Sequence, residues 1–467
     1  MTSRYFVEIF SSNKQQLLSL QKFELDLFQS TVKTLETNEF SIEGLITLDD
    51  VNKLVVKGYK VVVKKQSPST SPAISEIMSF SDSIQPTVTK KQAVTKKQAE
   101  TKKQAEAVST PSFTGYLTSG GIESALQQLA ILYPSISQLI ILPERTHEGR
   151  ISRAIKIGMP TPPAQQYPKS GLLFLGGVHA REIVNPDLLI KLAFDLCAAY
   201  TAKTGMTFGP KSYDADDVKK IVENLELYIF PLVNPDGRSY VQSPNGDIWW
   251  RKNKNPNPGF PAQGVDINRN YDFLWDSGIG TSTNSTTETY RGSKANSEPE
   301  TRNVVHMINN YENIACVIDV HSYSEDILYP WGDDDNQTDD PDMNFKNPGY
   351  DGQRGSPGDT SYKEYIHKKD LEWYESTAKR MTDAIASVRG RVYSAKPSVG
   401  LYPTSGTCDD FTYSLRYNGA GRDIKAFTIE EGKKFQPDYA EATNIISEVS
   451  AGLVESCLVL VPDDTAP

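Results

Sequence analysis

Cysteine and histidine are scarce in this chain, which also lacks a long apolar run and an excess of positive charge. Only four cysteines, widely spaced, and five histidines occur in 467 residues. A disulfide framework is therefore not expected, and Cys197 and Cys316 are interpreted as small buried apolar residues. The formal net charge is −10, which excludes a general nucleic-acid binder because phosphate binding needs a basic surface. No stretch approaches the roughly 18 apolar residues of a membrane span, so no membrane partner is predicted.

Composition divides the chain into three segments. Residues 1–65 alternate extended and helical patterns and predict a small α+β domain, with strands over 5–10, 40–47 and 59–65 and helices over 14–27 and 48–58. Residues 66–112 predict a low-complexity linker, because they are first Ser/Pro-rich and then repeat a Thr-Lys-Lys-Gln-Ala core three times without an apolar face. Residues 113–467 predict one large α/β domain.

Strand-like and helical patterns alternate in the large domain. The strands are expected over 151–157, 172–178, 225–233 and 314–320, and the helices over 122–132, 186–200, 298–311 and 365–388. The middle strands are almost continuously apolar, which is typical of strands covered on both faces. This alternation predicts a mixed, doubly wound sheet flanked by helices. In such sheets the reactive groups lie in the loops beyond the strand ends.

Three potential metal ligands follow predicted strands. His179 and Glu182 come directly after the strand over 172–178, and His321 comes directly after the strand over 314–320. Two imidazoles and one carboxylate fill three positions of a tetrahedral zinc site and leave the fourth for water. We therefore predict one catalytic Zn²⁺ per chain, bound by these three residues.

Nine short motifs around these ligands resemble the zinc carboxypeptidase family, which includes the pancreatic carboxypeptidases A and B. The motifs lie in family order at 146–150, 177–182, 234–237, 250–252, 264–270, 297–302, 321–324, 402 and 427–430. The resemblance covers most of 113–455 and implies a carboxypeptidase-like fold. The sequence departs from the digestive enzymes at Glu431-Gly432-Lys433 and in an acidic insertion over 333–369. Both departures resemble microbial members, and the insertion is expected to be a surface loop or, alternatively, a calcium site.

Glu430 is the candidate general base. It ends an apolar strand, where partial burial can raise the pKa of a carboxylate toward the working range. The resemblance implies that it faces the metal. The alternative is a strand-end carboxylate bound to a backbone amide.

The resemblance assigns the remaining site residues to substrate. Arg269, flanked by Asn268, would clamp the free α-carboxylate, because a planar guanidinium pairs two oxygens at once. Arg251 would stabilise the developing oxyanion, and Arg181 would support a neighbouring subsite. Tyr402 resembles the family's mobile tyrosine, which closes over the substrate.

Asp409 falls at the position that selects the C-terminal side chain in the family. An acid there would favour a C-terminal Lys or Arg. A shift by one residue would give Asp410 that place instead, and acids also occur here in family members with broad preference.

These observations predict a zinc-dependent metallocarboxypeptidase that acts on the C-termini of peptides or proteins. Two alternatives stay open: a related zinc amidohydrolase acting on cell-wall peptides, and a non-catalytic module that binds carboxylates. The segment 1–65 is interpreted as an inhibitory prodomain or an accessory domain. We expect a monomer.

The first ten residues do not match a secretory signal. They contain one basic residue and a short apolar run broken by Glu8, whereas a signal needs an apolar core of about 7–15 residues. We therefore expect a cytoplasmic protein from the sequence as given, or a secreted one if a leader is missing.

Overall fold

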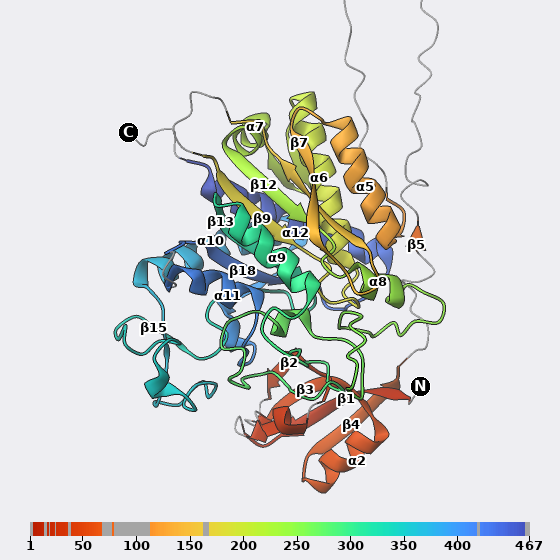
Figure 1. The fold of residues 1–467 in the computed structure, drawn as a ribbon, viewed down its shortest axis with the longest axis vertical. Helices are drawn as coiled ribbons and strands as arrows, with labels where there is room; N and C mark the ends of the chain where they lie inside the picture. The colour runs from red at the N-terminus through yellow and green to blue at the C-terminus, as the bar shows by residue number, and fades with distance from the viewer. Residues whose placement is uncertain are drawn as a thin grey trace, which may run out of the picture.

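The computed structural model describes residues 3–67, 77–78, 113–161, 168–417 and 421–462, apart from residues 14–15, 18, 24 and 36–38. Most of the predicted linker over 66–112 therefore lies outside the described residues. Figure 1 shows a small N-terminal sheet beside a large domain built on a central sheet.

The N-terminal segment forms a four-stranded antiparallel sheet in the order β2-β3-β1-β4. Its elements are β1 (Arg4–Ser11), the 3₁₀ helix η1 (Ser19–Phe23), β2 (Leu27–Thr34), β3 (Phe40–Thr47), α2 (Leu48–Val56) and β4 (Lys60–Gln66). Helix α2 begins at a capping box, in which the Thr47 side chain accepts a hydrogen bond from Asp50 N, satisfying an otherwise free amide.

The expected helix over 14–27 is wrong in its C-terminal part. Helical geometry ends at Phe23, and Leu27 begins strand β2. Strand β2 itself was not predicted. Its Phe28 is 4% exposed and packs edge-on against Phe435 of the large domain, with ring centroids 5.4 Å apart, so a contact with a distant segment stabilises this strand.

The large domain contains an eight-stranded mixed sheet in the order β17-β14-β18-β13-β9-β12-β8-β7. Its central strands β18, β13, β9 and β12 are parallel to one another, as expected for strands covered on both faces. The strands are β7 (Ser137–Arg145), β8 (Ile151–Ile157), β9 (Ser170–Leu175), β12 (Leu225–Phe230), β13 (Ile314–His321), β14 (Asp326–Tyr329), β17 (Ser394–Pro397) and β18 (Lys425–Glu430). The predicted mixed α/β fold is confirmed.

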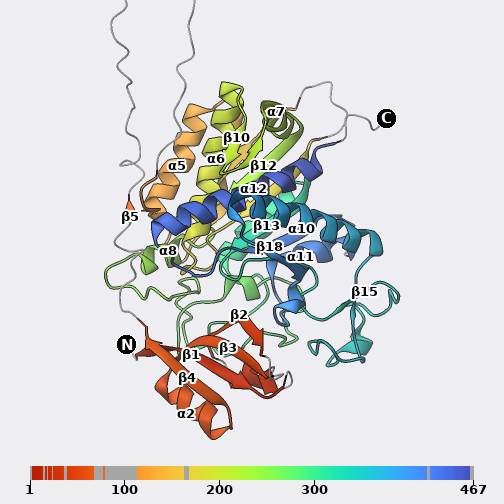
Figure 2. The ribbon, with the colours of Figure 1, turned by 180° about the vertical axis from the view of Figure 1, so that it is seen from behind.

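Helices cover both faces of this sheet. Helix α12 packs against both α6 and α10, and the three cross one face (Figure 2), whereas α9 and α11 lie on the other (Figure 1). The helices are α5 (Ser119–Leu132), α6 (Val184–Ala202), α7 (Ala215–Asn224), α8 (Pro235–Val241), α9 (Pro299–Asn310), α10 (Lys368–Arg389), α11 (Cys408–Ser414) and α12 (Tyr439–Leu460). Short elements complete the described chain: β5 (Ile77–Met78), β6 (Tyr116–Leu117), β10 (Met206–Phe208), β11 (Lys211–Tyr213), β15 (Asn336–Gln337), β16 (Glu364–Tyr365), η2 (Ile267–Arg269), η3 (Pro348–Tyr350), η4 (Ser398–Gly400) and η5 (Leu415–Tyr417).

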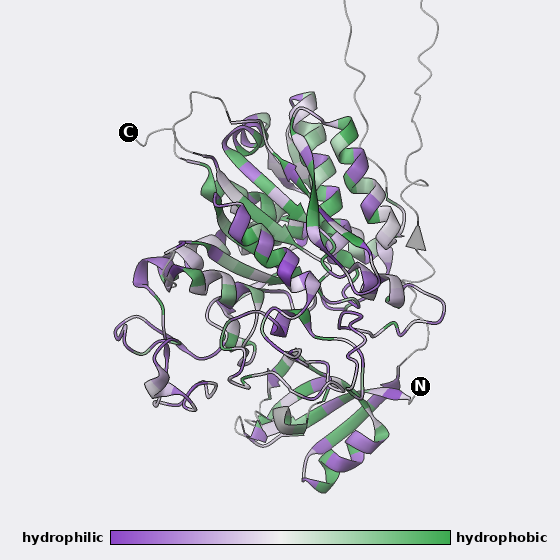
Figure 3. Ribbon diagram, in the orientation of Figure 1, coloured by the Kyte–Doolittle hydropathy of each residue, from purple (hydrophilic) through white to green (hydrophobic). Residues whose placement is uncertain are grey.

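Apolar residues concentrate in the strands of the central sheet (Figure 3), and together with buried residues of the helices they form one core cluster. Among the described residues one helix, α12, is long and apolar enough to cross a membrane, but 67% of its apolar window is buried inside the protein. It is therefore a core helix of the large domain. All four cysteines are free and buried.

The acidic insertion is not wholly a surface loop. Asp333, Asp334 and Glu364 are each at most 1% exposed, which corrects the expectation of a solvated segment. Backbone amides compensate part of the cost of burial: Gly355 N donates to Asp334 at 2.9 Å, and Phe345 N donates to Glu364 at 2.9 Å.

Candidate active site

The metal ligands lie at one edge of the sheet because they follow adjacent parallel strands. Strands β9 and β13 pair in parallel, with Leu175 opposite Asp319. His179 and Glu182 lie in the loop after β9, and His321 is the last residue of β13. The carboxyl ends of parallel strands thus bring together side chains that are about 140 residues apart in sequence.

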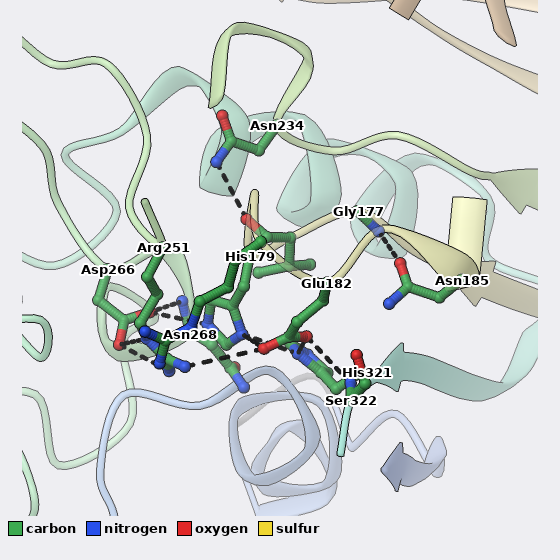
Figure 4. A network of polar contacts seen from close by, with 12 residues as sticks. Gly177, His179, Glu182, Asn185, Asn234, Arg251, Asp266, Asn268, His321 and Ser322 are labelled. Carbon is green, nitrogen blue, oxygen red and sulfur yellow. Dashed lines mark hydrogen bonds and ion pairs between the residues drawn. The ribbon is translucent and has the colours of Figure 1, made fainter. Parts of the chain in front are cut away.

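The three side chains converge on one point (Figure 4). One carboxylate oxygen of Glu182 lies 2.8 Å from Nδ1 of His179, and the other lies 3.0 Å from Nδ1 of His321. The two Nδ1 atoms are 3.0 Å apart. One donor atom from each residue lies within 4.8 Å of the others, and all three residues are buried. Imidazole nitrogens and a carboxylate at this spacing match a tetrahedral zinc ion with bonds of about 2.0–2.2 Å.

Two further carboxylates orient the imidazoles from behind. Oδ1 of Asp266 lies 3.1 Å from Nε2 of His179, and Oδ2 of Asp319 lies 3.0 Å from Nε2 of His321. The hydrogen bond with Asp266 turns Nδ1 of His179 toward the metal and raises the basicity of that ligand, and Asp319 places a negative charge beside His321. Sequence reasoning assigned no role to either aspartate. The Asp-x-His spacing was an available signal for Asp319, because residues i and i+2 of a strand share a face.

Opposite charges within the ligand cluster shift the pKa values of Glu182 and His321. Burial raises the pKa of the Glu182 carboxyl, but His179 and His321 outweigh this effect and hold it well below its usual value. Burial lowers the pKa of His321, but Asp319 and Glu182 outweigh this effect and raise it well above its usual value. The cluster therefore favours an ionised Glu182 carboxylate and positive charge at His321.

Glu430 faces this cluster from the neighbouring strand. Strand β18 pairs in parallel with β13, and Glu430 lies opposite His321. Burial, with the Glu182 charge adding to it, raises the pKa of Glu430 to about 8. Within the described part of the chain, no backbone amide donates a hydrogen bond to its carboxylate. The alternative role, a strand-end carboxylate bound to a backbone amide, therefore has no support. The next residue, Glu431, donates its N–H to the His321 carbonyl oxygen at 2.7 Å.

The predicted arginines lie around the same cleft. Arg251 donates from Nε and Nη2 to Asp266 at 3.1 and 3.0 Å, and its Nη1 is 3.9 Å from Glu182. Arg269 donates from Nη2 to the Tyr402 hydroxyl oxygen at 2.8 Å. Asn268 accepts a hydrogen bond from Cys408 N at 2.8 Å through its side-chain oxygen.

Asp409 lies on helix α11, behind the cleft. It is 4% exposed, and its carboxylate accepts a hydrogen bond from Ser398 Oγ at 2.8 Å. The neighbouring Asp410 instead accepts from Gly332 N at 3.0 Å. The two acids therefore have different surroundings, although they are adjacent in sequence.

The N-terminal domain covers the cleft. The cavity at the site has a volume of only about 70 Å³, far below the roughly 300–1,000 Å³ of ordinary ligand pockets. Its walls include residues of strand β2 as well as the predicted site residues: Leu27, Phe28, His179, Arg181, Glu182, Arg251, Asn268, Arg269, Ser322, Tyr323, Leu401, Tyr402, Glu430 and Phe435. Arg181 is held by Asp26, which sequence reasoning did not single out.

A comparison with known protein families covers most of the large domain and agrees with the geometry of the site. A model of the zinc carboxypeptidase family, Peptidase_M14, matches residues 122–449. The chain belongs to the zinc carboxypeptidase family. The members of this family are zinc-dependent, and the chain's donor set fits that metal.

Three curated members of the family show how similar this chain is to known proteins. Carboxypeptidase A4 of Mus musculus is 32% identical over 258 residues, covering 54% of this chain and 49% of that protein. Metallocarboxypeptidase A of Trichophyton tonsurans is 34% identical over 218 residues, covering 45% and 46%. Inactive metallocarboxypeptidase ecm14 of Talaromyces marneffei is 32% identical over 226 residues, covering 47% and 35%. The chain thus spans about half the length, or less, of the curated relatives it matches.

A solved structure matches the fold of both domains. Carboxypeptidase A from Helicoverpa armigera superimposes with a TM-score of 0.69 at 18% identity, covering 98% of this chain and 97% of that one. The small N-terminal domain is therefore part of the shared architecture.

Proposed function

We propose that this zinc carboxypeptidase family member is an active metallocarboxypeptidase that hydrolyses the C-terminal peptide bond of peptides or proteins. The observation that carries the proposal is the convergence of His179, Glu182 and His321 with Glu430 opposite them across the register of β13 and β18. Zinc bound by the three ligands would polarise the substrate carbonyl and lower the pKa of a water molecule.

Glu430 would act as the general base. Its carboxylate oxygen would accept a proton from the attacking water and then deliver that proton to the leaving amine nitrogen. A pKa raised by burial suits a group that must both take and release a proton near neutral pH. Arg251, whose orientation is set by two hydrogen bonds to Asp266, would stabilise the negative charge that develops on the carbonyl oxygen.

Arg269 and Asn268 would bind the free α-carboxylate and so limit cleavage to the chain end. Arg269 is 1% exposed, and one of its donors is directed at the Tyr402 hydroxyl. A substrate carboxylate would take over that donor and free Tyr402 to contact the substrate. Asp409 would select a C-terminal Lys or Arg.

We also propose that residues 1–65 form an inhibitory prodomain. Leu27 and Phe28 narrow the cleft to about 70 Å³, which leaves no room for a peptide. Asp26 accepts hydrogen bonds from Arg181, a residue proposed to bind substrate, and so makes its guanidinium unavailable to a peptide. Cleavage within the linker over 66–112 would release the domain and open the cleft.

One experiment tests both proposals. Peptides that differ only in their last residue are assayed with intact chain and with chain cleaved in the linker, using C-terminally amidated peptides as matched controls. We expect hydrolysis of the free acids only, with a higher rate after cleavage. Failure to hydrolyse any peptide, even with zinc added after cleavage, would favour a non-catalytic module that binds carboxylates. Muropeptides are assayed in parallel, and hydrolysis of muropeptides alone would favour the alternative of a zinc amidohydrolase acting on cell-wall peptides.

A further inference from the structure

A second group of possible metal ligands lies outside the cleft. Nε2 of His147, in the turn between β7 and β8, lies 2.9 Å from a carboxylate oxygen of Glu298, the residue before α9. Glu300, in the first turn of α9, completes the group. One donor atom from each of the three residues lies within 4.8 Å of the others.

The two glutamates are held in place by neighbouring amides. Asn253 Nδ2 donates to Glu298 at 2.7 Å and to Glu300 at 2.9 Å. The orientation of this amide is itself determined, because its oxygen accepts a hydrogen bond from Val265 N at 2.9 Å. Asn255 Nδ2 and Ser297 Oγ also donate to Glu298. A single amide group thus draws two buried carboxylates together.

One carboxylate oxygen of the group is left unpaired. Glu298 and Glu300 are 1% and 0% exposed, and the buried Oε1 of Glu300 has no hydrogen-bond partner among the residues that the structure describes. An unpaired buried carboxylate oxygen is costly. Burial, to which the Glu298 charge adds, raises the pKa of Glu300 to about 7. The charge of the His147 imidazole acts against this rise, and imidazole is also a common ligand of transition metals.

We propose that His147, Glu298 and Glu300 form a second binding site for a divalent transition-metal ion such as Zn²⁺ or Co²⁺. One imidazole nitrogen and two carboxylate oxygens suit these ions better than Ca²⁺ or Mg²⁺, which prefer oxygen ligands alone. The ion enters from the side of His147, whose side chain is 24% exposed.

The position of the site indicates a structural role. The cluster joins the β7–β8 turn, the start of α9 and, through Asn253, the segment that carries Arg251. A bound ion would cross-link these segments and stabilise the folded state, because the unfolded chain has no preformed site.

The test separates the two metal sites. The His179→Ala/His321→Ala variant removes the site in the cleft, and bound Zn²⁺ is counted after equilibrium dialysis near pH 7.5. We expect two ions per wild-type chain, one in this variant and none after adding His147→Ala. His306→Ala is the matched control, since His306 lies on α9 and hydrogen-bonds to Asn310, and it should leave the count unchanged.

A second substitution guards against misfolding. Glu300→Gln keeps the side-chain shape and should weaken Co²⁺ binding at this site by at least about tenfold, with an unchanged circular dichroism spectrum. The proposal is wrong if the cleft variant binds no metal, or if His147→Ala and Glu300→Gln leave its metal binding unchanged. These measurements count metal and do not depend on hydrolysis.

Discussion

Arg181 donates two parallel hydrogen bonds to Asp26, from Nη1 at 2.8 Å and from Nη2 at 3.1 Å. The pair joins the N-terminal domain to the wall of the cleft, and both side chains are almost completely buried, at 3% and 9% exposure. The Arg181 guanidinium also lies over the Phe435 ring, 4.3 Å from its centroid.

We expect Asp26→Asn to increase the activity of the intact chain. Removing one partner of a buried ion pair costs about 2–5 kcal/mol at an interface. The fraction of molecules in which the N-terminal domain has left the cleft should therefore rise more than about tenfold. The initial rate of peptide hydrolysis by uncleaved protein measures this effect. Asp49→Asn is the control, because Asp49 is exposed on α2. Equal rates for the two variants would show that the ion pair does not restrain the site.

Glu430→Gln should abolish turnover without releasing zinc. Loss of a general base typically lowers the rate by about 10²–10⁴-fold, while the three ligands stay in place. Steady-state kinetics and metal analysis of the same preparation give the two readings. Glu312→Gln, at an exposed position in the turn before β13, should change neither. Retained activity in the Glu430 variant would refute the assignment.

The activity should fall as the pH decreases through the pKa of Glu430. Burial raises that pKa to about 8, and only the ionised carboxylate can accept the proton of water. Positive charge from bound zinc lowers the pKa, so the acid limb of kcat/KM should lie below about pH 8. A profile of kcat/KM against pH on the zinc-loaded enzyme checks this. If the residual activity of Glu430→Gln showed the same decrease of kcat/KM at low pH, a group other than Glu430 would be responsible for it.

Asp319→Asn should weaken zinc binding. The carboxylate lies 3.0 Å from Nε2 of His321, and loss of such a partner typically costs about 10–100-fold in metal affinity. Competition with a chromophoric chelator measures the affinity. Asp272→Asn, at an exposed site, serves as the control and should bind zinc like the wild type.

Asp409→Asn should reduce the preference for a C-terminal Lys over Leu by about tenfold or more. Asp410→Asn is the matched comparison, because Asp410 is bonded to Gly332 N rather than to Ser398. The ratio of kcat/KM for two peptides differing only in that residue is the measurement. A larger change of this ratio in the Asp410 variant would show that Asp410, and not Asp409, selects the C-terminal side chain.

Local patterns in the sequence were sufficient for much of the large domain. The strand predicted over 151–157 is β8 with the same bounds, and the strand over 314–320 is β13 with one residue added. His179, Glu182 and His321 could be grouped from sequence because each follows an apolar strand, and strand exits in a parallel sheet share one edge. The family motifs then located Glu430, Arg251 and Arg269.

Contacts between distant segments decided the rest. Strand β2 was not predicted from the sequence, and its Phe28 packs on Phe435 of the large domain. The pairing of Asp26 with Arg181, and the convergence of His147 with Glu298 and Glu300, depend on how whole elements dock. Periodicity and motifs report the environment of a residue along its own strand or helix. They carry no information on which acid will face which base across an interface, because that depends on the packing of the complete chain.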